Sequence, residues 1–366
     1  MGSSKKKIII FNPSIEDGGV EKNLVNITNF LSDKFENTIL ISANENKNYF
    51  FKKKIERVFL KTNKKFSRKL RYLISIYLLI KELLKDKSKK LVLSFQANIY
   101  CIVICKIFGV KVITRSNASI HGWSTNFKLL LYKYIYSKAD SLIVNSLALK
   151  YEFNKILKLE CKVIYNPLDK KRIFKLYKKK NSKNFFTKES LNIINIGRLV
   201  DQKDHMTILK ALNEIKNKIN YKLIIIGDGT NLKKIKEFIK LNKLKKNIKL
   251  IKFNKNPFVY FKNAHFFISS SLFEGLPNAM LEAILLKKFV ISTDCPTGPR
   301  EILKKGEFGA LYPPSNFLKL SKLILYYNKN KKICHIKKQK AFNSLNRFDY
   351  NKNLHEYYKV IKKELI

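Results

Sequence analysis

The sequence predicts an α/β fold with two domains, each built around a doubly wound parallel sheet. The chain has 366 residues, which exceeds one ordinary domain and fits two of about 150–180 residues each. Short apolar runs typical of buried strands alternate with stretches of helical periodicity. This alternation fails in a charge-rich stretch that ends at residue 190. We therefore predict a first domain at residues 1–170, a linker at 171–190, a second domain at 191–345 and a last helix at 346–366.

The first domain supplies six runs with the apolar character of strands. They cover residues 7–11, 38–42, 91–94, 110–114, 141–144 and 162–165. Ligands of parallel sheets bind beyond the carboxyl ends of the strands, so the loops after these runs are candidate binding loops. The first loop holds Gly18 and Gly19 and precedes a helical pattern. Glycine lets a backbone approach a ligand closely, and a helix N-terminus favours phosphate, although a plain turn is the alternative.

The second domain continues with strand-like runs and a basic loop. The runs cover residues 191–196, 222–227, 248–253, 265–270, 289–292 and 308–314. Gly197 follows the first of them and permits an abrupt turn. Arg198 and Lys203 then emerge close together at the carboxyl end of that strand. Two cations at this place can neutralise a diphosphate, whereas a solvated pair is the alternative interpretation.

The stretch from Ser269 to Glu301 organises the second domain. A strand-like run leads into a loop that holds Glu274, and Pro277 stands at a plausible first position of the following helix. Glu274 should thus lie beside the N–H groups of a helix N-terminus, a natural seat for an anion. Glu282 is eight residues further on, more than one turn inside the helix. The two carboxylates are therefore expected to contact different parts of one ligand, unlike the facing acids of a glycoside hydrolase.

These residues carry a resemblance to a known family. Glu274 and Glu282, framed as S-x-x-E-G-L-P-N-A-M-L-E-A, resemble the E-x7-E signature of family-four retaining glycosyltransferases of the GT-B fold. The alternative is an ordinary helix start with a solvated acid. The resemblance extends over nearly the whole chain and is sharpest at residues 195–301. It implies two Rossmann-like domains that face each other across a cleft, with the C-terminal helix returning to the first domain.

The resemblance also implies roles for individual residues. Glu274, Arg198 and Lys203 match the catalytic positions, because G-R-L-x-x-Q-K matches the family's diphosphate-binding Arg/Lys pair. Glu274 would hold the sugar hydroxyls and Glu282 the ribose hydroxyls. The stretch G-G-V-E-K-N resembles the family's first loop, which faces the donor phosphates. The residues expected to bind the donor are Gly18, Gly19, Gly197, Gly275, Leu276, Pro277, Asn278 and Glu282.

The loop at residues 115–122, which follows the strand-like run 110–114, is a candidate for the acceptor or sugar side. Many relatives place a histidine directly after this strand, near the transferred sugar. Here Arg115 and Asn117 occupy the turn and His121 comes later. Any of these three side chains could take that place. A surface loop with an incidental histidine is the alternative.

The charge of the chain is extreme. The formal net charge of +48 is spread along the sequence and would attract polyanions or anionic lipid. Part of the excess can equally reflect compositional bias, since lysine far outnumbers arginine. Residues 64–90 form a basic, apolar helical pattern that suits a helix lying on anionic lipid. The same pattern also fits a surface helix with a solvated basic face.

The remaining features limit the function classes. The five cysteines are scattered, so a reducing, cytoplasmic location is expected, with attachment to the inner face of the membrane as an option. The histidines form no ligand cluster, and we expect no metal and no cofactor. The expected enzyme is a retaining hexosyl- or N-acetylhexosaminyl-transferase that uses a UDP-sugar and a lipid-linked or polysaccharide acceptor. The alternatives are a GT-B nucleotide-sugar epimerase and a polyanion-binding protein, although no specific nucleic-acid module is recognisable.

Overall fold

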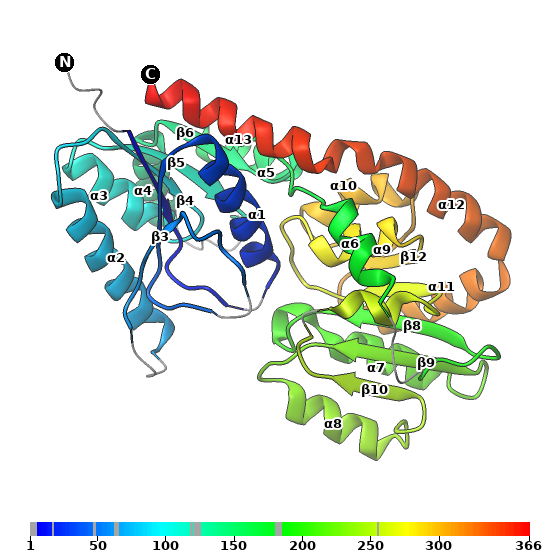
Figure 1. Ribbon diagram of the computed structural model, residues 1–366. Coiled ribbons are helices and arrows are strands. Elements are labelled where there is room, and N and C mark those ends of the chain that lie inside the picture. The colour runs from blue at the N-terminus through cyan, green and yellow to red at the C-terminus, as the bar shows by residue number, and fades with distance from the viewer. Residues whose placement is uncertain are drawn as a thin grey trace. The chain divides into compact units, whose positions relative to one another are not determined.

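The computed structural model describes residues 6–16, 18–46, 49–61, 66–117, 120, 126–179, 185–254 and 256–366. The chain divides into two compact units. Unit 1 consists of Met1–Pro167 and Tyr350–Ile366, and unit 2 consists of Leu168–Asp349 (Figure 1). The chain therefore leaves unit 1 after Pro167 and returns to it with the last helix.

Unit 1 is built around a seven-stranded parallel sheet with the order β3-β2-β1-β4-β5-β6-β7. Its strands are β1 Lys7–Phe11, β2 Asn37–Ile41, β3 Glu56–Val58, β4 Lys90–Ser94, β5 Lys111–Ser116, β6 Ser141–Val144 and β7 Lys162–Val163. The sequence predicted all of these except β3. That strand is short and largely exposed at the edge of the sheet, so it carries no apolar run.

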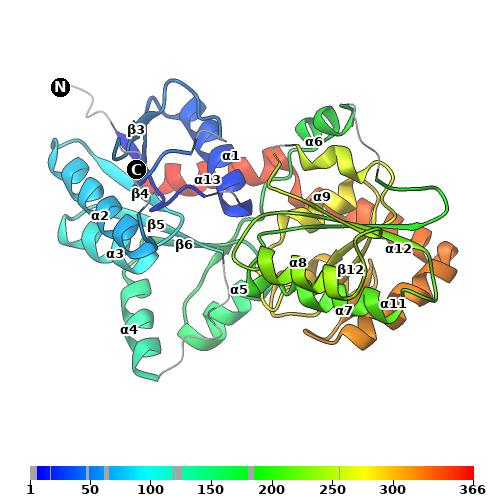
Figure 2. The ribbon, with the colours of Figure 1, turned by 90° about the horizontal axis from the view of Figure 1, so that it is seen from below.

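Helices cover both faces of this sheet. On one face α1 (Gly19–Lys34) and α13 (Tyr350–Leu365) pack against Ile8 and Ile10. The other face buries Ile9 and Phe11 under α2 (Arg68–Leu84), α3 (Asn98–Ile107), α4 (Asn126–Ser137) and α5 (Leu147–Glu152), which continues into the short helix η1 (Phe153–Leu157). Alternate residues of each strand thus serve opposite cores, as the pleat requires. Both views of the ribbon show this division of the helices (Figures 1 and 2).

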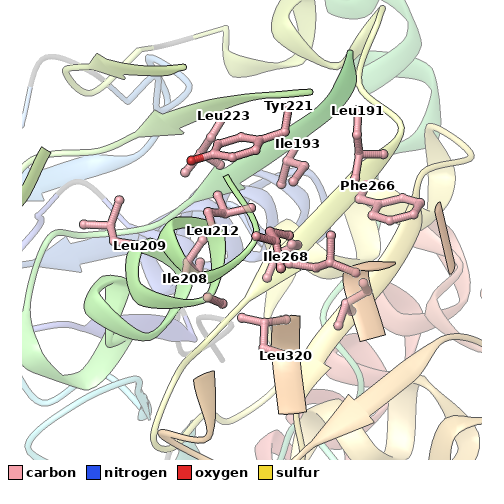
Figure 3. Close-up of a cluster of buried hydrophobic side chains, with 14 of the residues drawn as sticks. Leu191, Ile193, Ile208, Leu209, Leu212, Tyr221, Leu223, Phe266, Ile268 and Leu320 are labelled. Carbon is pink, nitrogen blue, oxygen red and sulfur yellow. The ribbon is translucent and has the colours of Figure 1, made fainter. Parts of the chain in front are cut away.

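Unit 2 contains a six-stranded parallel sheet with the order β10-β9-β8-β11-β12-β13. Its strands are β8 Leu191–Ile196, β9 Tyr221–Ile226, β10 Ile248–Ile251, β11 Phe266–Ser269, β12 Phe289–Thr293 and β13 Ala310–Tyr312. Its main helices are α6 Lys170–Tyr177, α7 His205–Glu214, α8 Leu232–Leu241, α9 Asn278–Leu285, α10 Gly298–Ile302, α11 Phe317–Lys329 and α12 Lys331–Asn343. Figure 3 shows how leucines and isoleucines of α7 and α11 meet residues of β8, β9 and β11 in one core.

The stretch that we predicted as a linker differs from the expectation. Residues 170–177 form helix α6. Asp169 directly precedes the helix, and its side chain accepts a hydrogen bond from the backbone N–H of Arg172. The helix buries Ile173 and packs against the 3-10 helix Pro257–Phe261 of unit 2. Most exposed positions of this helix are basic and only one position is buried, so the sequence shows no apolar periodicity there. Regular structure therefore begins in unit 2 before residue 191.

Candidate active site

The centre of the site is an ion pair between Lys203 and Glu274. Lys203 ends the 3-10 turn Asp201–Lys203 that follows β8, and Glu274 lies in the loop between β11 and α9. The Lys203 ammonium contacts Oε1 of Glu274. The Ser271 hydroxyl donates to the same carboxylate oxygen at 2.6 Å. Glu274 is buried, whereas the Lys203 side chain keeps 22% of its surface exposed. The structure thus brings together two of the three predicted catalytic residues.

Backbone contacts fix the positions of these two charges. The Ser270 hydroxyl donates to the Lys203 carbonyl at 2.8 Å, and the Leu272 N–H donates to the Gln202 carbonyl at 2.8 Å. The Gln202 side-chain amide in turn donates to the Phe273 carbonyl at 2.9 Å. Residues 202–203 and 270–273 are therefore joined at three points. Such support holds a pair of functional groups in a defined geometry before any ligand arrives.

The loop after β12 supports Glu274 from another direction. The Thr297 hydroxyl donates to the Glu274 carbonyl, and the Gly298 N–H donates to the Gly275 carbonyl at 2.8 Å. A Cβ at Gly298 would lie 1.9 Å from that carbonyl oxygen, so no larger residue fits. Thr297 has a φ of 78°, which is unusual for a β-branched residue and indicates a strained backbone. The T-G-P-R stretch therefore shapes the Glu274 loop.

Arg198 and Gly197 lie in the loop that leaves β8, and Arg198 is exposed. The loop packs tightly against the glycines after β9. The Leu199 N–H donates to the Asp228 carbonyl at 2.8 Å, and a Cβ at Gly227 would lie 1.9 Å from the Gly197 carbonyl oxygen. The G-D-G stretch thus has a structural reason, because two backbones approach closely there.

Helix α9 carries the other predicted donor-binding residues of unit 2. Pro277 was predicted as the first helical residue, but the helix begins one residue later and Pro277 directly precedes it. Gly275 and Leu276 precede Pro277 in the loop. Asn278 is the first helical residue. Glu282 is buried inside the helix. The N-terminus of α9 directs its positive end toward the loop of Glu274 and Gly275.

The environment of the ion pair shifts the pKa values of two neighbours. Burial raises the pKa of the Cys295 thiol to about 12; the Glu274 charge raises it too, and a hydrogen bond with Thr293 opposes the shift. Burial lowers the pKa of His205 to about 4, and the charge of Lys203 contributes in the same direction. Both groups are therefore neutral at pH 7. Among the residues that the structure describes, no three His, Cys, Asp or Glu side chains are grouped to hold a metal ion.

The predicted residues of unit 1 lie in two places. Gly18 is the residue before α1, its N–H donates to the Tyr49 hydroxyl at 3.0 Å, and a Cβ there would lie 2.7 Å from the Glu21 carboxylate. Gly19 is the first, exposed residue of the helix. A side chain at position 18 would thus require the end of the flexible Glu21 side chain to move. His121 lies outside the residues that the structure describes.

Arg115 lies at the carboxyl end of β5 and is completely buried. Its Nε donates to the Tyr357 hydroxyl at 2.6 Å and one terminal nitrogen donates to Asn166 Oδ1 at 2.6 Å. The other terminal nitrogen donates to Asn117 Oδ1, and the guanidinium lies 5.4 Å from the centre of the Phe95 ring. Sequence reasoning missed Tyr357, because nothing local in the last helix identifies a partner so distant along the chain. We name this group the Arg115 cluster.

Comparisons with known proteins identify the family. Residues 177–343 match the family model described as glycosyl transferases group 1. Unit 2 is a group 1 glycosyltransferase domain. An uncharacterised glycosyltransferase of Methanocaldococcus jannaschii is 41% identical over 190 residues, which cover 50% of this chain and 46% of that protein. The chain thus spans about half the length of this relative.

Two further comparisons extend over most of the chain. The N-acetylgalactosamine-N,N'-diacetylbacillosaminyl-diphospho-undecaprenol 4-alpha-N-acetylgalactosaminyltransferase of Campylobacter jejuni is 27% identical over 328 residues, 85% of this chain and 87% of that protein. The crystal structure of Anabaena HepE in complex with UDP-glucose superimposes with a TM-score of 0.79 at 18% identity, covering 98% of this chain and 99% of that one. The predicted GT-B fold with two Rossmann-like domains is thereby confirmed.

Proposed function

We propose that this glycosyltransferase moves a hexosyl or N-acetylhexosaminyl unit from a UDP-sugar to a lipid-linked or polysaccharide acceptor, with retention of anomeric configuration. The observation that carries the proposal is the supported Lys203–Glu274 pair at the carboxyl ends of β8 and β11 in the glycosyltransferase domain. Such strand ends are where doubly wound sheets bind their ligands. Retention rests on the family resemblance of the Glu274 to Glu282 stretch.

The ion pair suits the two halves of a nucleotide-sugar. A diphosphate would replace Glu274 as the anion beside Lys203, with exposed Arg198 as the second cation. Glu274 would then be released to accept hydrogen bonds from sugar hydroxyls. Fixed cations stabilise the negative charge that grows on the departing diphosphate more than they stabilise the ground state. Glu282 is proposed for the ribose hydroxyls and the α9 N-terminus for the diphosphate.

The acceptor side rests on a relative and on the charge. The Campylobacter enzyme acts, by its name, on a diphospho-undecaprenol glycan, and it aligns with most of this chain. A similar acceptor would place the protein at the inner face of a membrane. Among the residues that the structure describes, no helix is long and apolar enough to cross a membrane. The formal net charge of +48 would attract anionic lipid, and peripheral attachment is the form of association that we propose.

The test combines donor binding with turnover. In the double variant Arg198→Ala and Lys203→Ala, calorimetry should show that UDP affinity falls by roughly 100-fold or more, because two charge-assisted contacts are lost. UDP release from a panel of UDP-sugars should require an added lipid-linked acceptor. Unchanged turnover in the folded double variant would contradict the diphosphate assignment. The family match does not favour an epimerase or a polyanion-binding protein, and an epimerase would convert the donor without any acceptor.

A further inference from the structure

Four neighbouring helices of unit 1 expose an unusual number of large apolar side chains. On α3, Ile107 is 74% exposed, and on α4, Phe127 is 77% exposed. The exposed apolar residues of these helices are Leu70, Leu73, Tyr77, Leu84, Tyr100, Val103, Ile107, Phe127, Leu130, Leu131, Tyr134, Leu147 and Tyr151. We call the outward side of α2, α3, α4 and α5 the outer helix face.

The outer helix face is one continuous layer. All four helices cover the same face of the sheet, because their inward residues share one core. Within that layer α2 packs against α3, α3 packs against α4, and α4 packs against η1, which continues α5. The ribbon views agree that α2, α3 and α4 lie side by side, on the opposite side of the sheet from α1 and α13 (Figures 1 and 2). The exposed apolar side chains therefore belong to a common surface.

The charged residues of this layer have one sign. No Asp or Glu occurs within α3 or α4. The only carboxylates of α2 and α5, Glu82 and Glu152, are buried. The exposed basic residues of the four helices are Arg68, Lys69, Lys81, Lys106, Lys128, Lys133 and Lys150, and the exposed Lys138 directly follows α4. Lys106 forms an ion pair with Asp140, which lies beyond the end of α4, at 2.7 Å. The ammonium of Lys138 lies 4.8 Å from the centre of the Tyr134 ring, so apolar and basic groups are interleaved.

The combination is strongest in this layer. Helices α11 and α12 of unit 2 also lack Asp and Glu and expose lysines, but their exposed large apolar residues are only Leu318, Tyr326 and Ile336. On the other side of the same sheet, α1 and α13 expose no large apolar side chain within their described bounds. Helix α8 of unit 2 exposes several lysines, but also Glu237 and only one large apolar residue, Leu241. A compositional excess of lysine explains a basic surface anywhere in the chain. It does not explain why exposed leucine, isoleucine and phenylalanine gather in one layer without exposed acids.

We propose that the outer helix face is the surface with which this protein binds an anionic lipid bilayer. Apolar side chains would enter the interfacial region, and the surrounding lysines would contact headgroup phosphates. The proposal deepens the proposed lipid-linked acceptor by naming the surface that would lie on the membrane. A second copy of the chain fits this face poorly, because symmetric pairing would bring two layers of like charge together. Nucleic acid fits poorly because its phosphates offer nothing to protruding aliphatic side chains.

The first experiment is sedimentation of the full chain with vesicles. Phosphatidylglycerol mixed with phosphatidylcholine is compared with phosphatidylcholine alone. The variant Lys128→Gln, Lys133→Gln, Lys138→Gln should lose on the order of 100-fold in partitioning onto the anionic vesicles, at about one tenfold step or less per lysine. Its matched control is Lys233→Gln, Lys236→Gln, Lys240→Gln on α8, which removes the same charge and should bind like the unaltered protein. Equal losses in both variants would overturn the proposal, because only net charge would then matter.

The second variant tests the apolar contribution. Ile107→Gln, Phe127→Gln, Leu130→Gln should lower partitioning by about tenfold or more, and the part of binding that survives high salt should disappear. Its control is Leu241→Gln, Leu318→Gln, Ile336→Gln, three exposed apolar residues of unit 2. Sedimentation velocity adds a further decision. A dimer that the outer-face variant dissociates, without vesicle binding by the unaltered protein, would overturn the bilayer as the partner.

Measuring UDP affinity in the same variants distinguishes a failure of this proposal from a failure of the proposed function. All four variants leave the Lys203–Glu274 pair intact, so their UDP binding should equal that of the unaltered protein. Loss of vesicle binding with normal UDP binding supports the outer helix face. Vesicle binding without any UDP binding would instead contradict the donor site and leave the outer helix face supported.

Discussion

Each unit holds a charged group near the carboxyl end of a strand, Arg115 within β5 itself and Lys203 in the 3-10 turn after β8, but the surroundings of the two groups differ. Lys203 is partly exposed and pairs with a carboxylate. Arg115 is completely buried, and among the residues that the structure describes its hydrogen-bond partners are the neutral groups of Tyr357, Asn166 and Asn117. A ligand anion can replace the carboxylate that pairs with a cation, and the cation then binds the ligand. A charge surrounded by fixed dipoles is committed to the fold.

The Arg115 cluster also joins distant parts of unit 1. Asn166 directly precedes Pro167, where the chain leaves the unit, and Tyr357 belongs to the helix with which the chain returns. Nearby, the Tyr165 N–H donates to Asn353 Oδ1 at 3.0 Å. The cluster therefore attaches the last helix to the carboxyl ends of β5 and β7. The comparison predicts stability effects at Arg115 and binding effects at Lys203 and Glu274.

The largest expected effect follows removal of Arg115. Arg115→Ala removes the donor from two buried partners, Tyr357 and Asn166, and from the half-buried Asn117, and it opens a cavity in the unit. We expect the free energy of unfolding to fall by about 3–5 kcal/mol, as for one partner of a buried charged network. Urea denaturation measures the loss. Arg115→Lys, which keeps the charge but not the forked geometry, should be intermediate. A loss below about 1 kcal/mol would contradict the claim that Arg115 stabilises the fold of unit 1.

At Glu274 we expect a large loss of transfer activity and a small change in stability. Glu274→Gln keeps the shape of the side chain and an acceptor for Ser271, but removes the charge that pairs with Lys203. Transfer should fall by about 100-fold, because each hydrogen bond from a sugar hydroxyl to a charged acceptor contributes about 1.5–3 kcal/mol, more than one to a neutral amide oxygen. Stability should change by about 1 kcal/mol or less, since the Lys203 side chain is partly exposed and its ammonium can be solvated when the paired charge is removed. Stability loss as large as that of Arg115→Ala would show that both charges serve the fold.

A smaller effect on stability is expected at Tyr357. Tyr357→Phe removes only the hydroxyl that accepts from Arg115 Nε and leaves the packing of the ring in place. One buried charged donor then lacks an acceptor, which costs about 1–3 kcal/mol. A double-mutant cycle with Arg115→Ala isolates this contact, because Tyr357→Phe should cost little once Arg115 is gone. Additive losses would indicate that the hydroxyl acts through another group.

The sequence predicted the fold and the unit 2 pair better than the Arg115 cluster, for physical reasons. Parallel strands buried on both faces leave continuous apolar runs, so most strands were found, whereas the edge strand β3 and helix α6 bury too little to be seen. Lys203 and Glu274 were both expected in the donor site, Lys203 at the diphosphate and Glu274 at the sugar, because each follows a strand and belongs to a recognisable motif. Arginine is rarely buried completely. The partners of Arg115 also come from the loop after β5, the loop after β7 and the last helix, and no local pattern connects these three places.

The smallest expected effect concerns His205, which lies next to the ion pair in sequence and is buried. Burial is the main cause of its pKa of about 4, and the charge of Lys203 is the second cause. The variant Lys203→Met removes only the second cause. The pKa of His205, followed by NMR titration of the imidazole, should therefore rise slightly and stay below the ordinary 6.5.

The low pKa of His205 also makes stability depend on pH. Because the pKa of His205 is lower in the folded than in the unfolded chain, the unfolded chain takes up the proton first as the pH falls. Stability from neutral His205 is thus complete above about pH 6.5 and decreases toward pH 4. Lys203→Met should weaken this decrease, and an unchanged His205 titration would mean that solvent screens Lys203 more fully than its contact with Glu274 implies.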